Sequence, residues 1–174
     1  MGILRRLFGR KYTPSWDGLD PAAAKTEATS SADSVIYTGT ATIVIYDLES
    51  LRHRLDDYVD WWASTEDEIL ELNERNLLIV GLGSDGFYDV DVSDDQRGKN
   101  AFSLRFPSGR VFIGAGEMLT GGGDEPDADT PGIFLDLAPG DYKVGIERSD
   151  EQLRVSIVRS APFDNAVVEP VTLF

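Results

Sequence analysis

The chain has 174 residues, 31 of them acidic and 16 basic, which gives a formal net charge of -15 at pH 7. It has no cysteine, so disulfides, thiolate metal sites and cysteine nucleophiles are excluded. A surface this negative repels phosphate backbones, which argues against direct nucleic-acid binding and favours a basic protein as partner. The simpler meaning of the same charge is that it keeps the protein soluble.

The first 33 residues predict a basic N-terminal tail followed by a linker, and we expect a single folded domain over residues 34–174. Four basic residues open the chain: Arg5, Arg6, Arg10 and Lys11. The opening lacks the apolar stretch of a secretory signal, and no run approaches the ~20 apolar residues of a membrane span, so the sequence predicts a cytoplasmic protein. The basic tail could touch a membrane surface or a partner, although a frayed end is the more common meaning of such a segment.

Residues 34–47, SVIYTGTATIVIYD, are rich in β-branched and aromatic residues and predict one strand, or two strands interrupted at Gly39. A helix is predicted next, because apolar residues recur at helical spacing: Leu48, Leu51, Leu55, Val59 and Trp62. Asp47 is the expected N-cap of this helix. A second, short helix is indicated by Thr65 followed by Glu68, which is the spacing of a capping box.

From residue 77 onward the pattern is typical of β-strands. The predicted strands are 77–82, 86–92, 101–106, 110–115, 132–137, 141–148, 153–159 and 166–173. Three turn sequences, GSDG, FPSGR and LAPGDY, predict hairpins between neighbouring strands. Short strands at this spacing favour a mainly β fold of the β-rich α+β kind, an antiparallel β-sandwich with one or two short helices.

Gly81, Gly83 and Gly86 reproduce the letter pattern of a dinucleotide-binding turn. Such a turn must lead into a helix, because the pyrophosphate is bound by the free N–H groups at the helix start. Here FYDVDVS follows, which alternates apolar and polar residues and predicts a strand. We therefore expect these glycines to form a turn with positive φ, and we predict no cofactor.

The strand predicted at 86–92 should turn its apolar residues to the core and its acids to solvent, because side chains alternate along a strand. Tyr88, Val90 and Val92 would face the core, with Phe87, Asp89 and Asp91 outside and Asp94 and Asp95 following. This row of acids is a candidate surface for a basic protein; calcium at a loose site is an alternative, and a merely solvated face is the commonest case. The spacing of an EF-hand loop is absent, so no metal site is predicted.

Two further groups of residues are candidates for partner binding. Asp124, Glu125 and Asp127 lie in the glycine-rich segment TGGGDEPDADTPG, which predicts either a mobile acidic contact surface or simple disorder. In DDYVDWW, helical spacing places Trp62 on the apolar stripe and Trp61 nearer solvent. An exposed Trp61 beside Asp57 and Asp60 would have the composition of a binding hot spot, although packing of both tryptophans against the sheet is as reasonable.

Support for catalysis is weak. His53 is the one histidine, it lies between two arginines on the expected polar side of a helix, and no nucleophile elbow is present. We predict a binding protein rather than an enzyme. Two alternatives stay open: an enzyme using a pair of carboxylates, and a calcium- or carbohydrate-binding β-sandwich.

Four stretches, VIYDLESL, DDYVDWW, DGFYDVDVS and GIFLDLAPGDYKVGIE, together resemble the order of features in small acidic bacterial inhibitor proteins. The resemblance is to the competence-nuclease inhibitor family and to immunity proteins of toxin systems, and it covers residues 35–148 in outline. It implies a β-sandwich that binds and silences a cationic nuclease or other toxin. It assigns no role to any individual residue.

Overall fold

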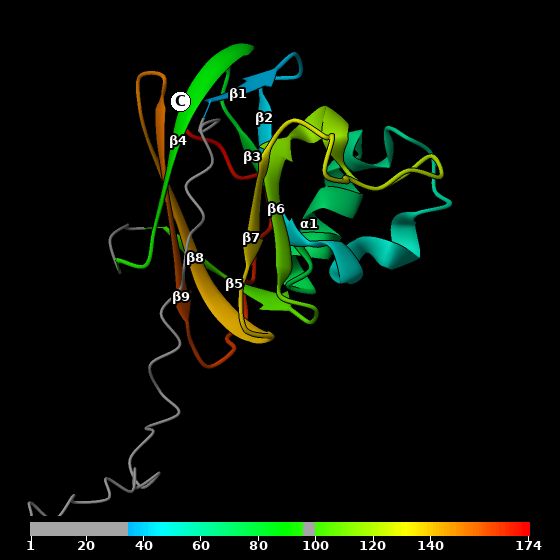
Figure 1. Ribbon diagram of the computed structural model, residues 1–174, viewed down its shortest axis with the longest axis vertical. Coiled ribbons are helices and arrows are strands. Elements are labelled where there is room, and N and C mark those ends of the chain that lie inside the picture. Colours follow the sequence, from blue (N-terminus) through cyan, green and yellow to red (C-terminus); the bar gives the residue numbers. More distant parts are fainter. Residues whose placement is uncertain (1–34, 96–99) are drawn as a thin grey trace, which may run out of the picture.

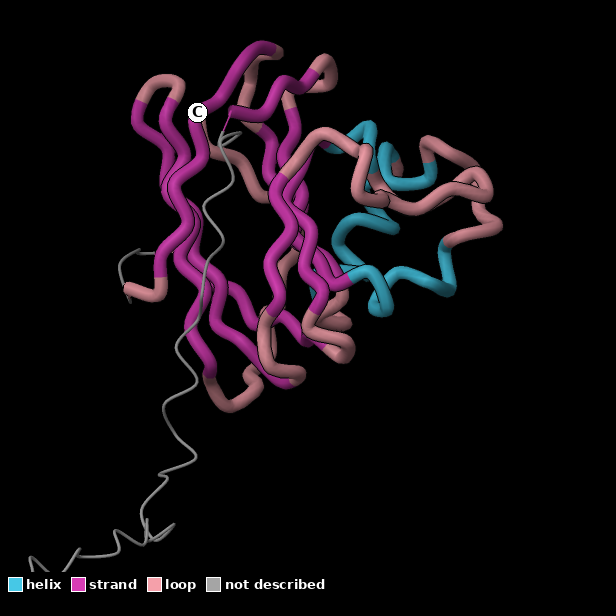
Figure 2. The backbone as a smooth tube through the Cα atoms, viewed as in Figure 1, coloured by secondary structure: helices cyan, strands magenta, loops and turns pink. Residues whose placement is uncertain are grey.

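The computed structural model describes residues 35–95 and 100–174, and the predicted tail and linker at 1–33 lie outside this part of the chain. Its strands form two stacked sheets (Figures 1 and 2). The five-stranded sheet has the order β1 (Val35–Thr38), β4 (Gly86–Ser93), β9 (Gln152–Arg159), β8 (Gly140–Ser149) and β5 (Ala101–Phe106). The four-stranded sheet has the order β3 (Leu77–Gly81), β2 (Thr42–Asp47), β6 (Arg110–Ala115) and β7 (Ile133–Asp136). The predicted β-rich sandwich is therefore confirmed.

Helical segments lie on the outer side of the four-stranded sheet (Figure 2). They are the 3-10 helices η1 (Leu48–Arg54), η2 (Trp61–Ala63) and η3 (Gly116–Met118), and the α-helix α1 (Thr65–Asn73). The prediction of one helix through residues 48–62 was wrong, because residues 55–60 are not helical and separate η1 from η2. The predicted N-cap is confirmed, since the Asp47 carboxylate accepts the N–H of Glu49. The N-cap of α1 is Ser64 rather than Thr65.

The two sheets differ in how many of their faces are buried, and the strand sequences explain the difference. Every residue of β2 from Ile43 to Asp47 is buried, because one side faces the sandwich core and the other faces the helical segments. Strand β4 instead alternates exposed and buried residues, as a strand with one solvated face should. Among residues 35–95 and 100–174, nothing covers the exposed side chains on the outer face of the five-stranded sheet at β1 and β4.

Strand pairing departs from the predicted antiparallel arrangement at one place, where β4 runs parallel to β9. The three turns predicted as hairpins also join different partners from those expected, since each leads the chain from one sheet into the other. A tight turn specifies that the chain reverses, but the pairing depends on which apolar faces meet. The β8–β9 connection at Asp150 and Glu151 is a true hairpin.

The C-terminal segment, residues 160–174, was predicted to form a strand at 166–173, and that prediction was wrong. The segment instead crosses from the edge of β5 to the edge of β3. At β5, the Asn165 side chain accepts the N–H of Ser103 (2.7 Å) and donates to the Ser103 carbonyl (3.0 Å). At β3, Gly81 donates to the Val171 carbonyl (2.8 Å) and Leu173 donates to the Gly81 carbonyl (2.9 Å). The segment therefore ties the two sheets together along one open side of the sandwich.

The role of the glycine pattern follows from this crossing. Gly83 has a φ of +75° and Gly86 a φ of +145°, so the predicted turn with positive φ is confirmed. A Cβ at Gly81 would lie 3.3 Å from Thr172, and one at Gly83 would lie 3.0 Å from the Phe174 ring. These two glycines leave room for the C-terminal segment against the end of β3.

No helix in the described part of the chain is long and apolar enough to cross a membrane.

Replacing Asn165 with alanine removes the group that satisfies both backbone atoms of Ser103 at the β5 edge. We expect N165A to lower the free energy of unfolding by about 1–3 kcal/mol, since buried backbone groups lose their partners. Urea denaturation followed by tryptophan fluorescence measures this change. Val168→Ala is the control, because Val168 is 87% exposed in the same segment and its truncation should leave stability unchanged.

Candidate protein-binding surfaces

Strand β4 places its acids as the sequence predicts. Tyr88 and Val90 are buried and Val92 is half-buried against the core, whereas Asp89 and Asp91 are exposed beside Phe87. Asp94 and Asp95 follow the strand and are also exposed. The acidic side of β4 therefore belongs to the open outer face of the five-stranded sheet.

Aromatic side chains lie next to these acids, and the sequence analysis gave them no functional role. Tyr37 of β1 is directly opposite Phe87 of β4, and the centroids of their rings are 4.9 Å apart. Tyr37 is 54% exposed, Phe87 67% and Val35 54%. We call Val35, Tyr37, Phe87, Asp89 and Asp91 the β1–β4 face. The alternating burial of VIYT in β1 is typical of a strand with one solvated side, and that pattern is the signal in the sequence that could have indicated this face.

A hollow of about 260 Å³ continues this surface toward β9 and β8. Asp91, Asp95 and Glu147 line it together with Arg154. Arg154 is the cross-strand neighbour of both Asp91 and Glu147, so one positive charge lies among three negative ones. The acidity of β4 is thus partly compensated at this end.

Hydrogen bonds to Glu117 hold the turn that connects β1 to β2. The Glu117 carboxylate accepts the N–H of Gly39 (2.7 Å) and the hydroxyls of Thr40 (2.7 Å) and Thr38 (3.2 Å). Burial by itself raises the pKa of Glu117, but the hydrogen bonds from Gly39 and Thr40 outweigh it and hold this pKa below its ordinary value. Glu117 therefore fixes the connection from β1 to β2 as an ionised carboxylate.

The other predicted partner-binding acids lie on the opposite side of the molecule, where the helical segments cover the four-stranded sheet (Figure 1). The N–H of Gly122 donates to the Asp57 carbonyl (2.7 Å), and that of Gly123 donates to the Leu55 carbonyl (2.7 Å). These bonds dock the glycine-rich loop onto the segment between η1 and η2. They bring Asp124 and Glu125 near Asp57 and Asp60, but they leave this group far from β4, so the predicted residues form two surfaces and not one.

Trp61 is buried, which corrects the prediction of an exposed tryptophan. It is 6% exposed, and its Nε1 donates to the Thr120 carbonyl (2.8 Å). The prediction assumed a continuous α-helix, and the break before η2 rotates Trp61 inward and leaves Trp62 half-buried. A Cβ at Gly121 would lie 3.0 Å from the Trp61 ring, so this glycine permits the close contact. Tyr58, 75% exposed, is the aromatic residue that faces solvent here.

Asp127 forms hydrogen bonds within its own loop. Its carboxylate accepts the N–H of Asp129 and the hydroxyl of Thr130, both at 3.0 Å. The hydrogen bond from the Asp129 N–H is the main cause that lowers the pKa of Asp127. The loop therefore has a defined turn around Asp127.

An ion-pair network centred on Arg54 neutralises part of this side, and the sequence analysis missed it. Arg54 donates to Glu71 (2.7 Å), Asp57 (3.0 Å) and Asp67 (3.0 Å), and its guanidinium lies 4.5 Å from the Trp61 ring centroid. Burial lowers the pKa of Arg54, but the bonds to these three carboxylates more than offset it and raise the pKa above its ordinary value. No spacing rule links residues 54 and 71, since they meet only through tertiary packing.

Glu71 is the buried member of the network, with a side chain that is 3% exposed. Besides Arg54 it contacts His53 Nε2 (2.9 Å) and accepts a hydrogen bond from Asn76 (2.8 Å). His53 is half-exposed, as expected for the polar side of a helix, but it is paired with this carboxylate. The cluster holds η1 against α1.

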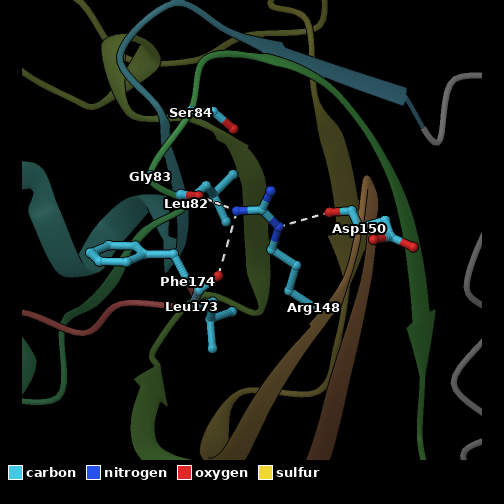
Figure 3. A pocket seen from close by; sticks show the side chains of 7 residues that line it. All are labelled: Leu82, Gly83, Ser84, Arg148, Asp150, Leu173 and Phe174. Atoms are coloured by element: carbon cyan, nitrogen blue, oxygen red, sulfur yellow. Dashed lines mark hydrogen bonds between the residues drawn. The ribbon is translucent and has the colours of Figure 1, made fainter.

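A second hollow, of about 580 Å³, lies at the end of the sandwich around Arg148 (Figure 3). Arg148 donates to the carbonyls of Asp150 (2.7 Å), Leu82 and Leu173, and its guanidinium lies 5.2 Å from the Tyr88 ring centroid. These contacts join the β8–β9 hairpin, the β3–β4 turn and the C-terminal segment. The arginine thus has a structural role at this end. Within residues 35–95 and 100–174, no three His, Asp or Glu side chains converge closely enough to hold a metal ion.

Residues 30–173 match the model of a family of unknown function, DUF6386. The chain belongs to this family. Among solved structures, "Crocagin biosynthetic gene J" is similar at 15% identity and a TM-score of 0.47, covering 73% of this chain and 95% of that chain. ComJ from Bacillus subtilis, an inhibitor of the DNA degrading activity of NucA, is similar at 10% identity and a TM-score of 0.40, covering 72% and 93%.

The solved structures that are similar to this chain thus include an inhibitor of a DNA-degrading activity, the kind of protein that the sequence resembles. At these identities and TM-scores the likeness says nothing about which residues bind. A search of curated proteins finds no match to this chain.

Glu71→Gln keeps the volume of the side chain but removes the charge that faces Arg54. We expect it to lower the free energy of unfolding by about 3 kcal/mol, because it leaves a poorly exposed arginine with one fewer counter-charge. Thermal and urea unfolding measure the change. Glu74→Gln removes an exposed acid beyond the end of α1 and should be nearly neutral; equal effects of the two variants would contradict the network.

Glu117→Gln tests the β1–β2 turn through the pH dependence of the free energy of unfolding. Because the folded-state pKa of Glu117 lies below the ordinary value of 4.5, its contribution is complete above that value and is lost as the pH falls through the folded-state pKa. We expect E117Q to be about 1 kcal/mol less stable than the unsubstituted protein at pH 7, with the difference shrinking as the pH falls from 4.5 through the folded-state pKa. Urea denaturation across this pH range measures it, with Glu125→Gln in the exposed loop as the matched control.

Proposed function

We propose that this protein is an acidic binding protein that neutralises a basic partner, as an inhibitor or immunity protein of a nuclease or other toxin does. The observation that supports the proposal is the β1–β4 face, where an exposed aromatic pair adjoins carboxylates on an uncovered sheet. We propose a binding role and not a catalytic one.

The chemistry of this face suits a basic protein. Tyr37 and Phe87 offer apolar area that is costly to leave in water, and aromatic rings bind arginine and lysine side chains through cation–π contacts. Asp89 and Asp91 supply opposite charge beside the rings. In interfaces of this kind, aromatic anchors limit the dissociation rate, while surrounding charges accelerate association.

The helical side supports the proposal less well. Arg54 already binds the carboxylates of Asp57 and Asp67, and Asp127 is engaged within its own loop. Trp61 is only 6% exposed, so it offers little contact area, although it lines a hollow of about 450 Å³ together with Asp57 and Asp60. On the β1–β4 face, by contrast, the apolar groups are exposed and adjoin the acids directly.

The overall charge of -15 extends the attraction beyond contact distance. Long-range steering of this kind falls as salt screens the charges, with a Debye length of about 10 Å at 0.1 M. A nuclease is the partner that we propose to test first, in line with the resemblance stated from the sequence.

The test begins with recovery of basic proteins from the native cell at low salt, followed by inhibition of any recovered nuclease by the purified protein. With that partner, Phe87→Ala should weaken affinity by about tenfold or more, as expected for an aromatic anchor. Leu70→Ala is the matched control, because Leu70 is 49% exposed on α1 at the other side of the molecule.

Asp91→Asn should slow association and reduce its salt dependence, with little effect on dissociation. Asp129→Asn removes an exposed acid in the loop and serves as its control. Stopped-flow association at several salt concentrations measures both variants. Failure to recover any basic partner, or an affinity that is insensitive to salt and to F87A, would overturn the proposal.

A further inference from the structure

The rest of the chain covers the outer edges of some of the outermost strands and leaves that of β1 uncovered. The edges of β5 and β3 are covered by the C-terminal segment, through Asn165 and through Val171 and Leu173. Strand β1 lies at the other end of the five-stranded sheet and, among the described residues, pairs with β4 alone. Its sequence, VIYT, holds no charge, proline or glycine of the kind that proteins use to protect an edge.

The backbone groups of β1 that face its outer edge can be identified from the register. Asp89 donates its N–H to Glu151, so the backbone of Asp89 points away from β1. In an antiparallel ladder, opposed residues alternate between bonded and non-bonded pairs. Val35 is opposite Asp89 and Tyr37 is opposite Phe87, so these are the non-bonded pairs. The N–H and C=O groups of Val35 and Tyr37 therefore point outward along the free edge.

The side chains beside this edge define what could lie there. If a strand paired with the free edge of β1, every second side chain of that strand would lie on the solvent-exposed face. Those side chains would lie beside Val35 and Tyr37, which are both about half exposed. On the same face, Tyr37 packs against Phe87 of the neighbouring strand β4, and Asp89 of β4 lies opposite Val35. Strands are spaced about 4.8 Å apart, so an arginine or lysine at an outer position can lie over Tyr37 and extend toward Asp89.

Charge selects among the possible occupants. A second copy of this chain carries the same charge of -15 and would be repelled. A basic extended segment would pair with the outward backbone groups, and its charge is opposite to that of the acids on this face. We propose that the partner binds by adding a strand to the free edge of β1, through an extended segment with arginine or lysine at alternate positions. This inference rests on the proposed function and specifies the chemistry of the partner's binding segment.

The test uses the full chain and a defined probe, a seven-residue peptide that alternates arginine and valine and has blocked ends. Amide hydrogen exchange, followed by NMR at about 0.15 M salt, should show the Val35 and Tyr37 amides slowing by roughly tenfold or more when the peptide is added. The Ile36 and Thr38 amides are already bonded to β4 and should change little. A peptide of the same composition, with the arginines and valines in separate blocks, should give no such selective protection.

A matched pair of variants separates backbone pairing from simple charge attraction. Val35→Pro removes one outward N–H at the first residue of the strand, where proline is tolerated, and should weaken binding of the alternating peptide by about tenfold. Val35→Thr keeps the N–H and the β-branched shape and should bind as before. Equal binding by the two folded variants, or peptide binding without protection of Val35 and Tyr37, would overturn strand addition.

Other occupants give distinct results. Slow exchange of the Val35 and Tyr37 amides without peptide would show that the edge is already filled, by a second copy if it depends on protein concentration and by the chain itself if it does not. Either result overturns the inference. If a basic partner is recovered and F87A weakens it while V35P does not, the proposed function stands and strand addition fails.

Discussion

Tyr46 and Phe112 project from the outer face of the four-stranded sheet, and their burial determines how the rest of the chain is arranged. Their rings are 5.9 Å apart, and both are inaccessible to solvent beneath the helical segments. Burying an aromatic side chain of this size contributes about 2–3 kcal/mol relative to leaving it exposed. The segment between β2 and β3 must therefore cover this face, and the glycine-rich loop after η3 closes over Trp61. Since the described helical segments all lie on this sheet, the outer face of the five-stranded sheet is left open by the described part of the chain.

The distribution of charge follows from the same arrangement. On the covered side, Arg54 and Glu71 are packed between η1 and α1, and they draw Asp57 and Asp67 into a network that serves stability. On the open side, the acids of β4 lie beside exposed aromatic rings, with Arg154 of β9 directly opposite Asp91. Acidic residues that look alike in the sequence thus divide into structural and surface groups.

The C-terminal segment gives the sandwich a second asymmetry. Asparagine side chains attach this segment to its neighbours. Asn165 forms hydrogen bonds with the backbone of β5, and Asn73 of α1 forms hydrogen bonds with the backbone of the segment. Glycines at the end of β3 make room for its last residues. One side of the sandwich is closed in this way, and in the described part of the chain β1 has a free edge on the other side.

The amino-acid sequence by itself determined the class of fold, most strand boundaries, the Asp47 cap and the outward direction of Asp89 and Asp91, because these depend on local periodicity and turn chemistry. Local pattern could not show that the three predicted hairpins connect different sheets, that Trp61 is buried, or that Arg54 meets Glu71. Those features arise where residues distant in the chain compete for the same buried surface. The tertiary structure alone decided that Tyr37 lies beside Phe87, since only the pairing of β1 with β4 brings the two rings together.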